Sequence, residues 1–182
     1  MKPRIAVTLL LLTGLQACTS PAPQTELLAS DWTKVGDGSY SHKPSGALCA
    51  ASDEGFMLKG LQLLAIEGRL GTCEYVDSSG RRGEIRVRRY LPGVGETPLA
   101  IENDKTLMEG GTIPGQPDQK PTSAIRVGPG PAINGEPSQR EVITVKRNGL
   151  LIDCAAWEKV SQFTNSSPIV RFAISCLHMP GE

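Results

Sequence analysis

The chain has 182 residues, of which 39% are hydrophobic, 4% aromatic and 21% charged. Its 19 basic and 19 acidic residues balance to a net charge of zero, which argues against a general nucleic-acid-binding protein. The length suffices for one domain with its own core. The sequence contains no phosphate-binding loop, dinucleotide fingerprint, zinc-protease motif or hydrolase nucleophile elbow.

The chain begins MKPRIAVTLLLLTGLQAC, in which Lys2 and Arg4 precede an apolar run that ends in small residues. This order is typical of a secretory signal peptide, because the run is shorter than the ~20 residues of a bilayer span. The segment LQAC (15–18) resembles the lipobox of bacterial lipoproteins. The resemblance implies cleavage before Cys18 and acylation of that cysteine. A plain signal peptide cut near Ala17 is the alternative.

The lipobox resemblance also implies a location. Several acyl chains such as palmitate on one cysteine anchor a protein stably to a membrane. In this family an aspartate at the second mature position retains the protein in the inner membrane, and Thr19 stands there. We therefore expect an outer-membrane lipoprotein facing the periplasm; the inner membrane and the soluble periplasm are the alternatives. Residues 1–17 would be the signal peptide, 18–30 a flexible tether and 31–182 a single periplasmic domain.

Four cysteines remain for the domain, an even number in an oxidising compartment, which predicts two disulfides. Their wide spacing does not suit zinc, and we expect neither a metal nor a cofactor. Local pairing would join Cys49 to Cys73 and Cys154 to Cys176. Cross-pairing, such as Cys73 with Cys154 and Cys49 with Cys176, carries equal weight, because a hairpin of strands 150–157 and 168–177 would hold Cys176 too far from Cys154.

The first half of the domain predicts strands. In FMLKGLQLLAIEG (56–68) we expect a strand over the second half, between two glycines, and GTCEYV (71–76) predicts another. DSSGRRG (77–83) has the composition of a turn. EIRVRRYL (84–91) alternates apolar and basic residues, as a half-buried antiparallel strand does.

A helix and a long loop are expected next. ETPLAIENDKTLMEGG (96–111) predicts a helix with Pro98 at its first position. From residue 110 to 138 there are six glycines and six prolines, which predict a long loop interrupted only by a short strand, TSAIRV (122–127). Loops of this length are commonly functional or mobile.

The carboxyl-terminal part again predicts strands. REVITVKRN (140–148) and LLIDCAAWE (150–158) meet at Asn148-Gly149, a strong hairpin signal. PIVRFAISCL (168–177) alternates like a closing strand. The order predicts an α+β fold: a mainly antiparallel sheet with one central helix and a long Pro/Gly-rich loop. An all-β fold without the helix is the alternative.

The segment RRGEIRVRRY concentrates arginines, and alternation places Arg86 and Arg88 on one strand face. With Arg82 they form our candidate anion-binding surface, for lipid headgroups, lipopolysaccharide phosphates or an acidic protein. The alternative is an ordinary solvent-exposed sheet face, on which acids such as Glu84 pair with the arginines.

Evidence for catalysis is sparse. His42 with Ser39, Ser41 or Ser45 is the only local cluster of a histidine with several hydroxyls, and an exposed loop histidine is the simpler interpretation. The neighbouring acids Glu102 and Asp104 are interpreted as solvated surface rather than a glycosidase pair. Trp32 and Trp157 are expected to be core or rim anchors rather than ligand platforms.

The sequence favours a non-enzymatic binding, assembly or structural role in the envelope. SHKPSG (41–46) followed by GF (55–56) resembles uncharacterised bacterial envelope proteins, which implies no activity. The expected partners are the membrane, through the lipid anchor, and an envelope protein or anionic glycolipid, but not nucleic acid. Two alternatives stay open: a periplasmic, hydrolase-like enzyme with an unrecognised site near His42 or in the 110–138 loop, and an inhibitor-like domain.

Overall fold

The computed structural model describes residues 29–63, 68–94, 98–109, 115 and 121–179. The expected signal peptide, the lipobox cysteine and nearly all of the expected tether lie outside these residues. Within the described part, ten strands form two antiparallel sheets, which confirms the expected fold class. None of the described helices is long and apolar enough to cross a membrane.

A small sheet opens the domain. It is an antiparallel meander in which β2 lies between β1 and β3. The indole nitrogen of Trp32 donates to the backbone oxygen of Leu70 at 3.0 Å, so the meander is attached to the larger sheet. Trp32 is buried, as expected of a core anchor. The bounds are β1 (Trp32–Val35), β2 (Ser39–His42) and β3 (Ala47–Cys49).

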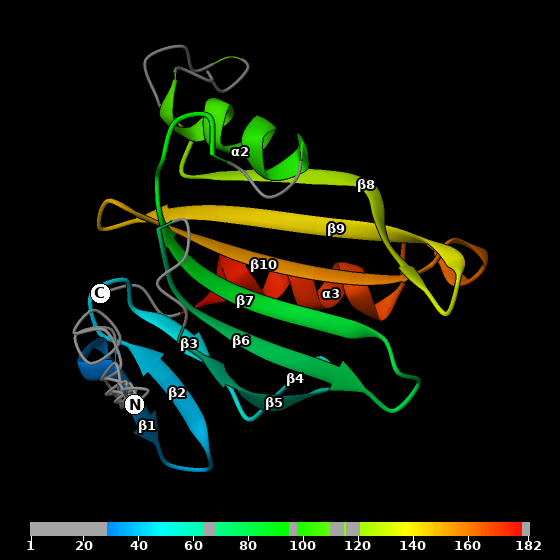
Figure 1. Ribbon diagram of the computed structural model, residues 1–182, viewed down its shortest axis with the longest axis horizontal. Helices are drawn as coiled ribbons and strands as arrows, with labels where there is room; N and C mark the ends of the chain where they lie inside the picture. Colours follow the sequence, from blue (N-terminus) through cyan, green and yellow to red (C-terminus); the bar gives the residue numbers. More distant parts are fainter. Residues whose placement is uncertain (1–28, 64–67, 95–97, 110–114, 116–120, 180–182) are drawn as a thin grey trace, which may run out of the picture.

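The larger sheet has seven strands in the order β4-β5-β6-β7-β10-β9-β8, and it forms the body of the molecule (Figure 1). Every neighbouring pair is antiparallel. The bounds are β4 (Ser52–Asp53), β5 (Phe56–Gln62), β6 (Arg69–Asp77), β7 (Arg82–Arg89), β8 (Ser123–Ile133), β9 (Glu136–Arg147) and β10 (Leu150–Lys159).

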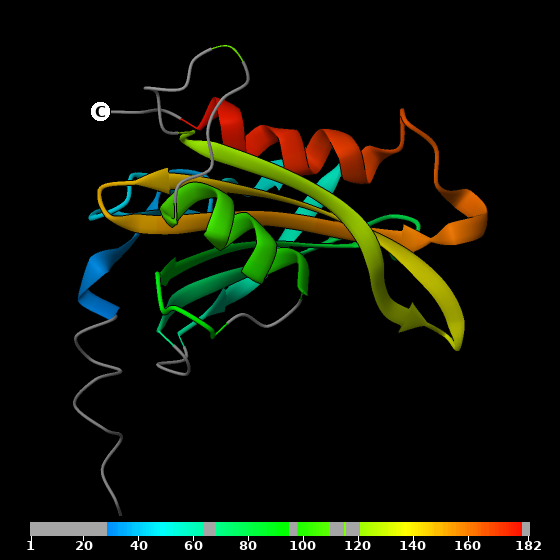
Figure 2. The ribbon, with the colours of Figure 1, turned by 90° about the horizontal axis from the view of Figure 1, so that it is seen from above.

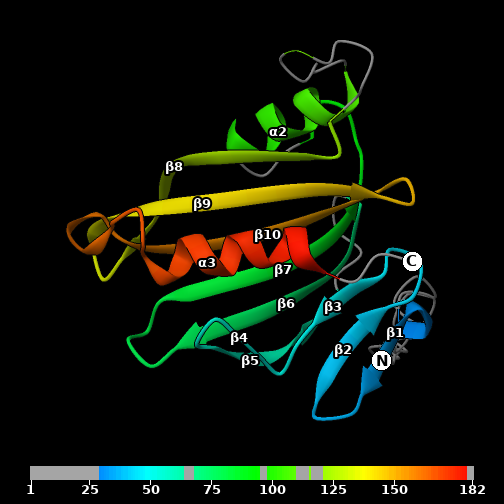
Figure 3. The ribbon, with the colours of Figure 1, turned by 180° about the vertical axis from the view of Figure 1, so that it is seen from behind.

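A helix covers each face of this sheet. Helix α3 (Pro168–Ser175) crosses the face seen in Figure 3, packed on β10 and β9. Helix α2 (Pro98–Met108) lies against β8 and β9 on the opposite face (Figure 2). The main apolar core lies under α3, where the ring of Phe172 packs against Phe56 and Tyr75. The face under α2 is more polar and carries the candidate site.

The predicted strand over 168–177 is wrong. These residues form α3, followed by the short 3-10 helix η2 (Cys176–His178). Ile169, Phe172, Ala173 and Cys176 are buried, so the apolar positions recur at the three- and four-residue spacing of a helix. Pro168 suits the first turn of a helix, where its missing N–H has no intrahelical partner to lose.

The helix explains the disulfide pairing. Cys49 is bonded to Cys73 and Cys154 to Cys176, so local pairing is correct and the cross-paired arrangement is wrong. The cross-paired option assumed an extended chain of about 3.4 Å per residue, whereas a helix rises about 1.5 Å per residue. The compact helical segment therefore keeps Cys176 above β10, within bonding distance of Cys154.

Much of the predicted 110–138 loop is a β-hairpin instead. The short strand expected at 122–127 extends to Ile133, and β9 already begins at Glu136. The two residues between them, Asn134 and Gly135, have φ values of 53° and 80°, as in a two-residue hairpin turn. Prolines are tolerated because β8 is an edge strand, which need not donate on its free side. Of the first part of that loop, residues 110–114 and 116–120 lie outside the described residues.

Other expectations were largely met. The helix expected at 96–111 and the Asn148-Gly149 hairpin are confirmed. In 56–68 the strand β5 begins at fully buried Phe56, in the first half of the segment that we did not expect to be extended, and it continues to Gln62. Residues 64–67 of that segment lie outside the described part of the chain.

Candidate functional site

Arg86 and Arg88 do not form an exposed anion-binding surface. Only 5% of Arg86 and 6% of Arg88 is exposed, because both side chains lie on the sheet face that α2 partly covers. The expectation that this face of β7 is exposed, either as a binding surface or as an ordinary solvated face, is therefore wrong for these two residues. Alternation did place them on one face, but β7 is buried on both sides.

Arg88 holds two buried carboxylates. Its Nη1 and Nη2 donate to both oxygens of Asp104 at 2.8 and 2.5 Å. Its Nε and Nη2 donate to both oxygens of Asp153 at 2.7 and 3.2 Å. Burial raises the pKa of Asp104, and the Arg88 guanidinium opposes that shift. Asp104 is thus part of an internal ion cluster, not the solvated acid expected from the sequence.

The cluster continues through neutral groups. The Thr144 hydroxyl donates to Asp153 at 2.8 Å, and the Asn103 amide donates to Thr144 at 3.0 Å. Asn103 and Asp104 come from α2, whereas the other members come from the sheet. The ion cluster therefore attaches α2 to the sheet through directional bonds. Its members are too buried to meet a ligand.

Arg86 is also bound to a carboxylate, that of Glu84. Its Nη2 donates to Glu84 Oε1 at 2.9 Å, and Arg140 Nη2 donates to the same oxygen at 2.5 Å. One carboxylate therefore links β7 to β9 across β10. The Arg140 guanidinium lies 5.6 Å from the centroid of the Trp157 ring, within cation–π range. This contact orients Trp157, the residue on which the candidate site centres.

The third predicted residue, Arg82, has a different environment. It is exposed at the start of β7, directly opposite Trp157 in the strand pairing. On the other side, Trp157 pairs with Arg140 of β9. Arg82, Trp157 and Arg140 thus form a row across three strands. Arg82 makes no hydrogen bond or ion pair with any described side chain, so its guanidinium is available to a ligand.

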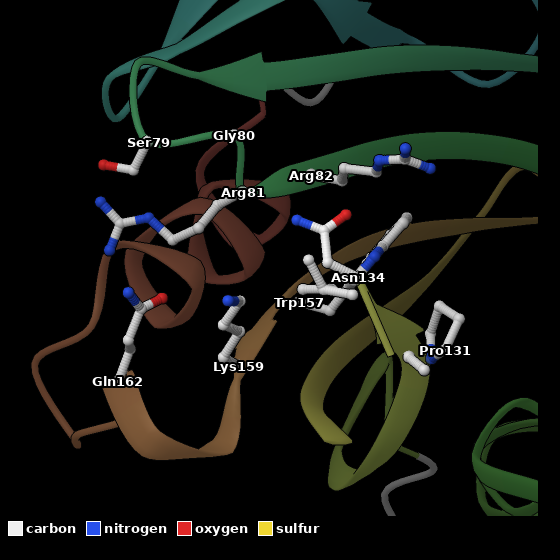
Figure 4. A pocket seen from close by; sticks show the side chains of 11 residues that line it. Ser79, Gly80, Arg81, Arg82, Pro131, Asn134, Trp157, Lys159 and Gln162 are labelled. Atoms are coloured by element: carbon white, nitrogen blue, oxygen red, sulfur yellow. The ribbon is translucent and has the colours of Figure 1, made fainter. Parts of the chain in front are cut away.

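A cleft of about 310 Å³ opens beside this row at the end of the sheet (Figure 4). Three separate segments form it: the β6–β7 turn, the β8–β9 hairpin tip, and the end of β10 with the 3-10 helix η1 (Val160–Gln162). Figure 2 shows this end of the hairpin curling towards the face that carries α2. The lining residues are Ser79, Gly80, Arg81, Arg82, Pro131, Ala132, Ile133, Asn134, Trp157, Lys159 and Gln162.

The described lining carries three cations and no carboxylate. Arg81 is committed to Asp77 at 2.5 Å and to fully buried Glu158 at 3.1 Å. Lys159 pairs with Glu136 at 2.7 Å, but that glutamate side chain is 54% exposed, so the pair is weak. Arg82 is thus the one cation of the described lining that pairs with no acid. A second cavity of about 330 Å³ shares Arg82 and Trp157 as lining residues.

A glycine leaves space for the aromatic wall. A methyl group at Gly130 would lie 3.4 Å from the Trp157 Cβ, 3.2 Å from the Arg140 Cβ, and closer still to the Ser138 hydroxyl. The residue at position 130 must therefore lack a side chain for the β8–β9 hairpin to curl over the indole. Trp157 is half-buried here, which agrees with the expected rim anchor.

His42 is not an exposed loop residue. It lies on β2, fully buried, with its Nδ1 2.8 Å from the Ser45 hydroxyl and its ring 4.8 Å from that of Trp32. Burial lowers the pKa of its imidazole. Ser39 bonds to Asp37 rather than to the histidine. With no access to substrate, this cluster has the character of a core element of the meander.

The sequence signal missed for the cleft was a second Asn-Gly pair. Asn134-Gly135 carries the same hairpin signature as Asn148-Gly149, but it stood inside a Gly/Pro-rich segment interpreted as a loop. Recognising it would have predicted the hairpin whose tip forms one wall of the cleft. No local sequence pattern indicated that Trp157 lines this cleft, because its neighbours there come from strands distant in sequence.

Comparison with known proteins adds no constraint: no protein-family model, curated protein or solved structure matches this chain significantly. The part of the chain that the structure describes contains no group of three or more potential metal ligands.

Proposed function

We propose that this chain is a membrane-anchored envelope lipoprotein with a binding role, and that it takes up an anionic ligand in the Trp157 cleft. The observation that carries the proposal is the unpaired guanidinium of Arg82 next to a half-buried indole. Arginine presents a planar set of donors that matches carboxylate and phosphate oxygens. A cleft of this size is at the small end of ordinary ligand sites.

Binding, rather than catalysis, suits the groups available there. The described lining offers cationic and neutral hydrogen-bond donors but no carboxylate or imidazole. General acid–base or nucleophilic chemistry requires a base within hydrogen-bond reach of the reacting group. The unpaired guanidinium of Arg82 instead favours holding a negative charge.

The cleft is tested by comparing Arg82→Gln with Arg89→Gln in the full-length protein. Arg89 is an exposed arginine at the other end of the same strand and serves as a matched control. Binding of inorganic phosphate is measured by isothermal titration calorimetry. We expect Arg82→Gln to weaken binding about 10-fold or more, since hydrogen bonds to charged groups contribute about 1.5–3 kcal/mol. Equal losses in both variants, or none, would refute the proposed cleft.

The anchor requires a separate test. Expression of the full-length chain with and without Cys18→Ser, followed by intact mass and membrane fractionation, reports lipidation directly. We expect a mass gain of several acyl chains that disappears in the variant. A soluble, unmodified wild-type chain would refute the lipoprotein proposal and leave the cleft to be judged on its own test.

A further inference from the structure

We infer that the ligand of the Trp157 cleft is an acidic sugar: a sugar ring that stacks on the indole and carries a phosphate or carboxylate bound by Arg82. The inference rests on the proposed function and names its ligand class. A bare inorganic anion would use only the cations of the cleft. The cleft offers more than cations, and those further groups indicate the rest of the ligand.

The aromatic wall is held in place before any ligand arrives. Trp157 is on a central strand, with Arg140 close to its ring, and Arg140 is itself fixed by Glu84. The Arg140 side chain is only 9% exposed. A rigid aromatic surface is costly to leave half-exposed to water, and it binds ligands with little loss of side-chain entropy. The C–H face of a sugar ring is an apolar surface of suitable shape for it.

Neutral polar groups surround this wall. Asn134 comes from the hairpin tip, Gln162 from η1 and Ser79 from the β6–β7 turn, and Figure 4 shows the Asn134 amide beside the indole of Trp157. Amides and hydroxyls both donate and accept hydrogen bonds, as sugar hydroxyls do. A carboxylate is an acceptor only and a phosphate carries few O–H donors, so a bare anion would leave most acceptor atoms of these groups unused. A fatty anion would require apolar walls instead.

The strand pairing also fixes the position of the Arg82 charge relative to the Trp157 ring. Arg82 is opposite Trp157 in the strand pairing, so its side chain starts on the same sheet face and beside the indole. A substituent projecting from a sugar stacked on Trp157 would reach this guanidinium. The volume of about 310 Å³ suits one such sugar unit better than a long oligomer. The sugar's source, whether free in solution or on a glycolipid, is a separate question for the experiment.

The experiment uses purified full-length protein in detergent and three acidic sugars: glucose 1-phosphate, glucosamine 1-phosphate and glucuronate. Inorganic phosphate and glucose are the reference ligands. Affinity is measured by calorimetry, and tryptophan fluorescence reports on the cleft, since Trp32 is buried elsewhere. We expect at least one acidic sugar to bind 10-fold more tightly than either reference. Vesicles of phosphatidylcholine with or without lipid A, a phosphorylated glycolipid, distinguish a lipid-borne sugar from a soluble one.

Three variants separate the contributions of the ring and of the guanidinium. Trp157→Leu should remove the advantage of the sugar while phosphate binding persists, and Trp157→Phe should recover part of it; circular dichroism checks that both fold. Arg82→Gln should weaken the sugar and the phosphate alike. If phosphate binds through Arg82 but none of the acidic sugars, free or lipid-borne, binds more tightly, the sugar inference is overturned and the proposed function stands. If no anion binds, both are overturned.

Discussion

Removing Arg88 should destabilise the domain severely while leaving the cleft's lining residues in place. The side chains of Arg88, Asp104 and Asp153 are 8%, 6% and 3% exposed, so water cannot replace the lost partner. Arg88→Met keeps most of the volume but removes four hydrogen bonds and the only positive charge that contacts both acids in the described structure. Two carboxylates would then face each other in the interior.

The magnitude follows from that geometry. Breaking a buried ion pair by removing one partner costs about 3–5 kcal/mol, mainly because a charge is left uncompensated. For a domain of this size, 1 kcal/mol shifts Tm by about 2–4 °C, so we expect Tm to fall by about 6–20 °C. Exposed Arg89 adjoins Arg88, and Arg89→Met should stay within about 0.5 kcal/mol of wild type.

Urea unfolding at several pH values checks both the size and the cause. Without Arg88, burial and repulsion from Asp153 raise the pKa of Asp104 in the folded state above its unfolded value. The folded state then binds more protons than the unfolded state, so stability falls as pH rises. The deficit of Arg88→Met should therefore shrink as pH is lowered from 7 towards 5.

A second substitution isolates the charge effect. Adding Asp104→Asn to Arg88→Met removes one of the two carboxylates left without a cationic partner, so it should recover part of the lost stability. The effects of the two substitutions are then not additive, as expected for residues in contact. The account is refuted if Arg88→Met costs less than about 1 kcal/mol, or if its deficit grows as the pH is lowered.

Other predictions concern the meander, the cleft and the disulfides. Because burial lowers the pKa of His42 in the folded state, the imidazole of the unfolded state is protonated first as the pH falls. The free energy of unfolding should therefore decrease below about pH 6.5, by at most about 1.4 kcal/mol per pH unit. Urea unfolding should show that His42→Gln, but not the exposed control His178→Gln, flattens this slope. Gly130→Ala should lower the free energy of unfolding by about 1–3 kcal/mol and alter the fluorescence of Trp157. The control Gly60→Ala, whose added methyl group meets no atom, should leave that fluorescence unchanged. An unchanged spectrum for both variants would contradict the close packing of Gly130 against Trp157. Peptide mapping without reduction should recover the two local disulfide pairs, and any cross-linked pair between the two halves of the chain would contradict the fold.

Features governed by neighbouring residues were predictable from the sequence. The helix at Pro98 and the hairpin at Asn148-Gly149 depend on local backbone preferences, which act the same way in any fold. Alternation along β7 correctly placed Arg86 and Arg88 on one face. The sequence also contained the Asn134-Gly135 signal for the hairpin beside the cleft, although its Gly/Pro-rich surroundings favoured a loop.

The environment of each face was decided only by tertiary structure. Whether Arg88 meets water or two carboxylates depends on α2, whose Asp104 is remote from β10 in sequence yet reaches the same guanidinium as Asp153. Likewise, α3 has an apolar pattern short enough to fit either period, and its packing on β10 selects the helix and the disulfide partner. Side-chain burial is a property of what packs on an element, and in an antiparallel sheet with non-sequential neighbours those elements are distant along the chain. The cleft is the clearest case, because Arg82, Asn134 and Trp157 become neighbours only when three separate segments meet at one end of the sheet.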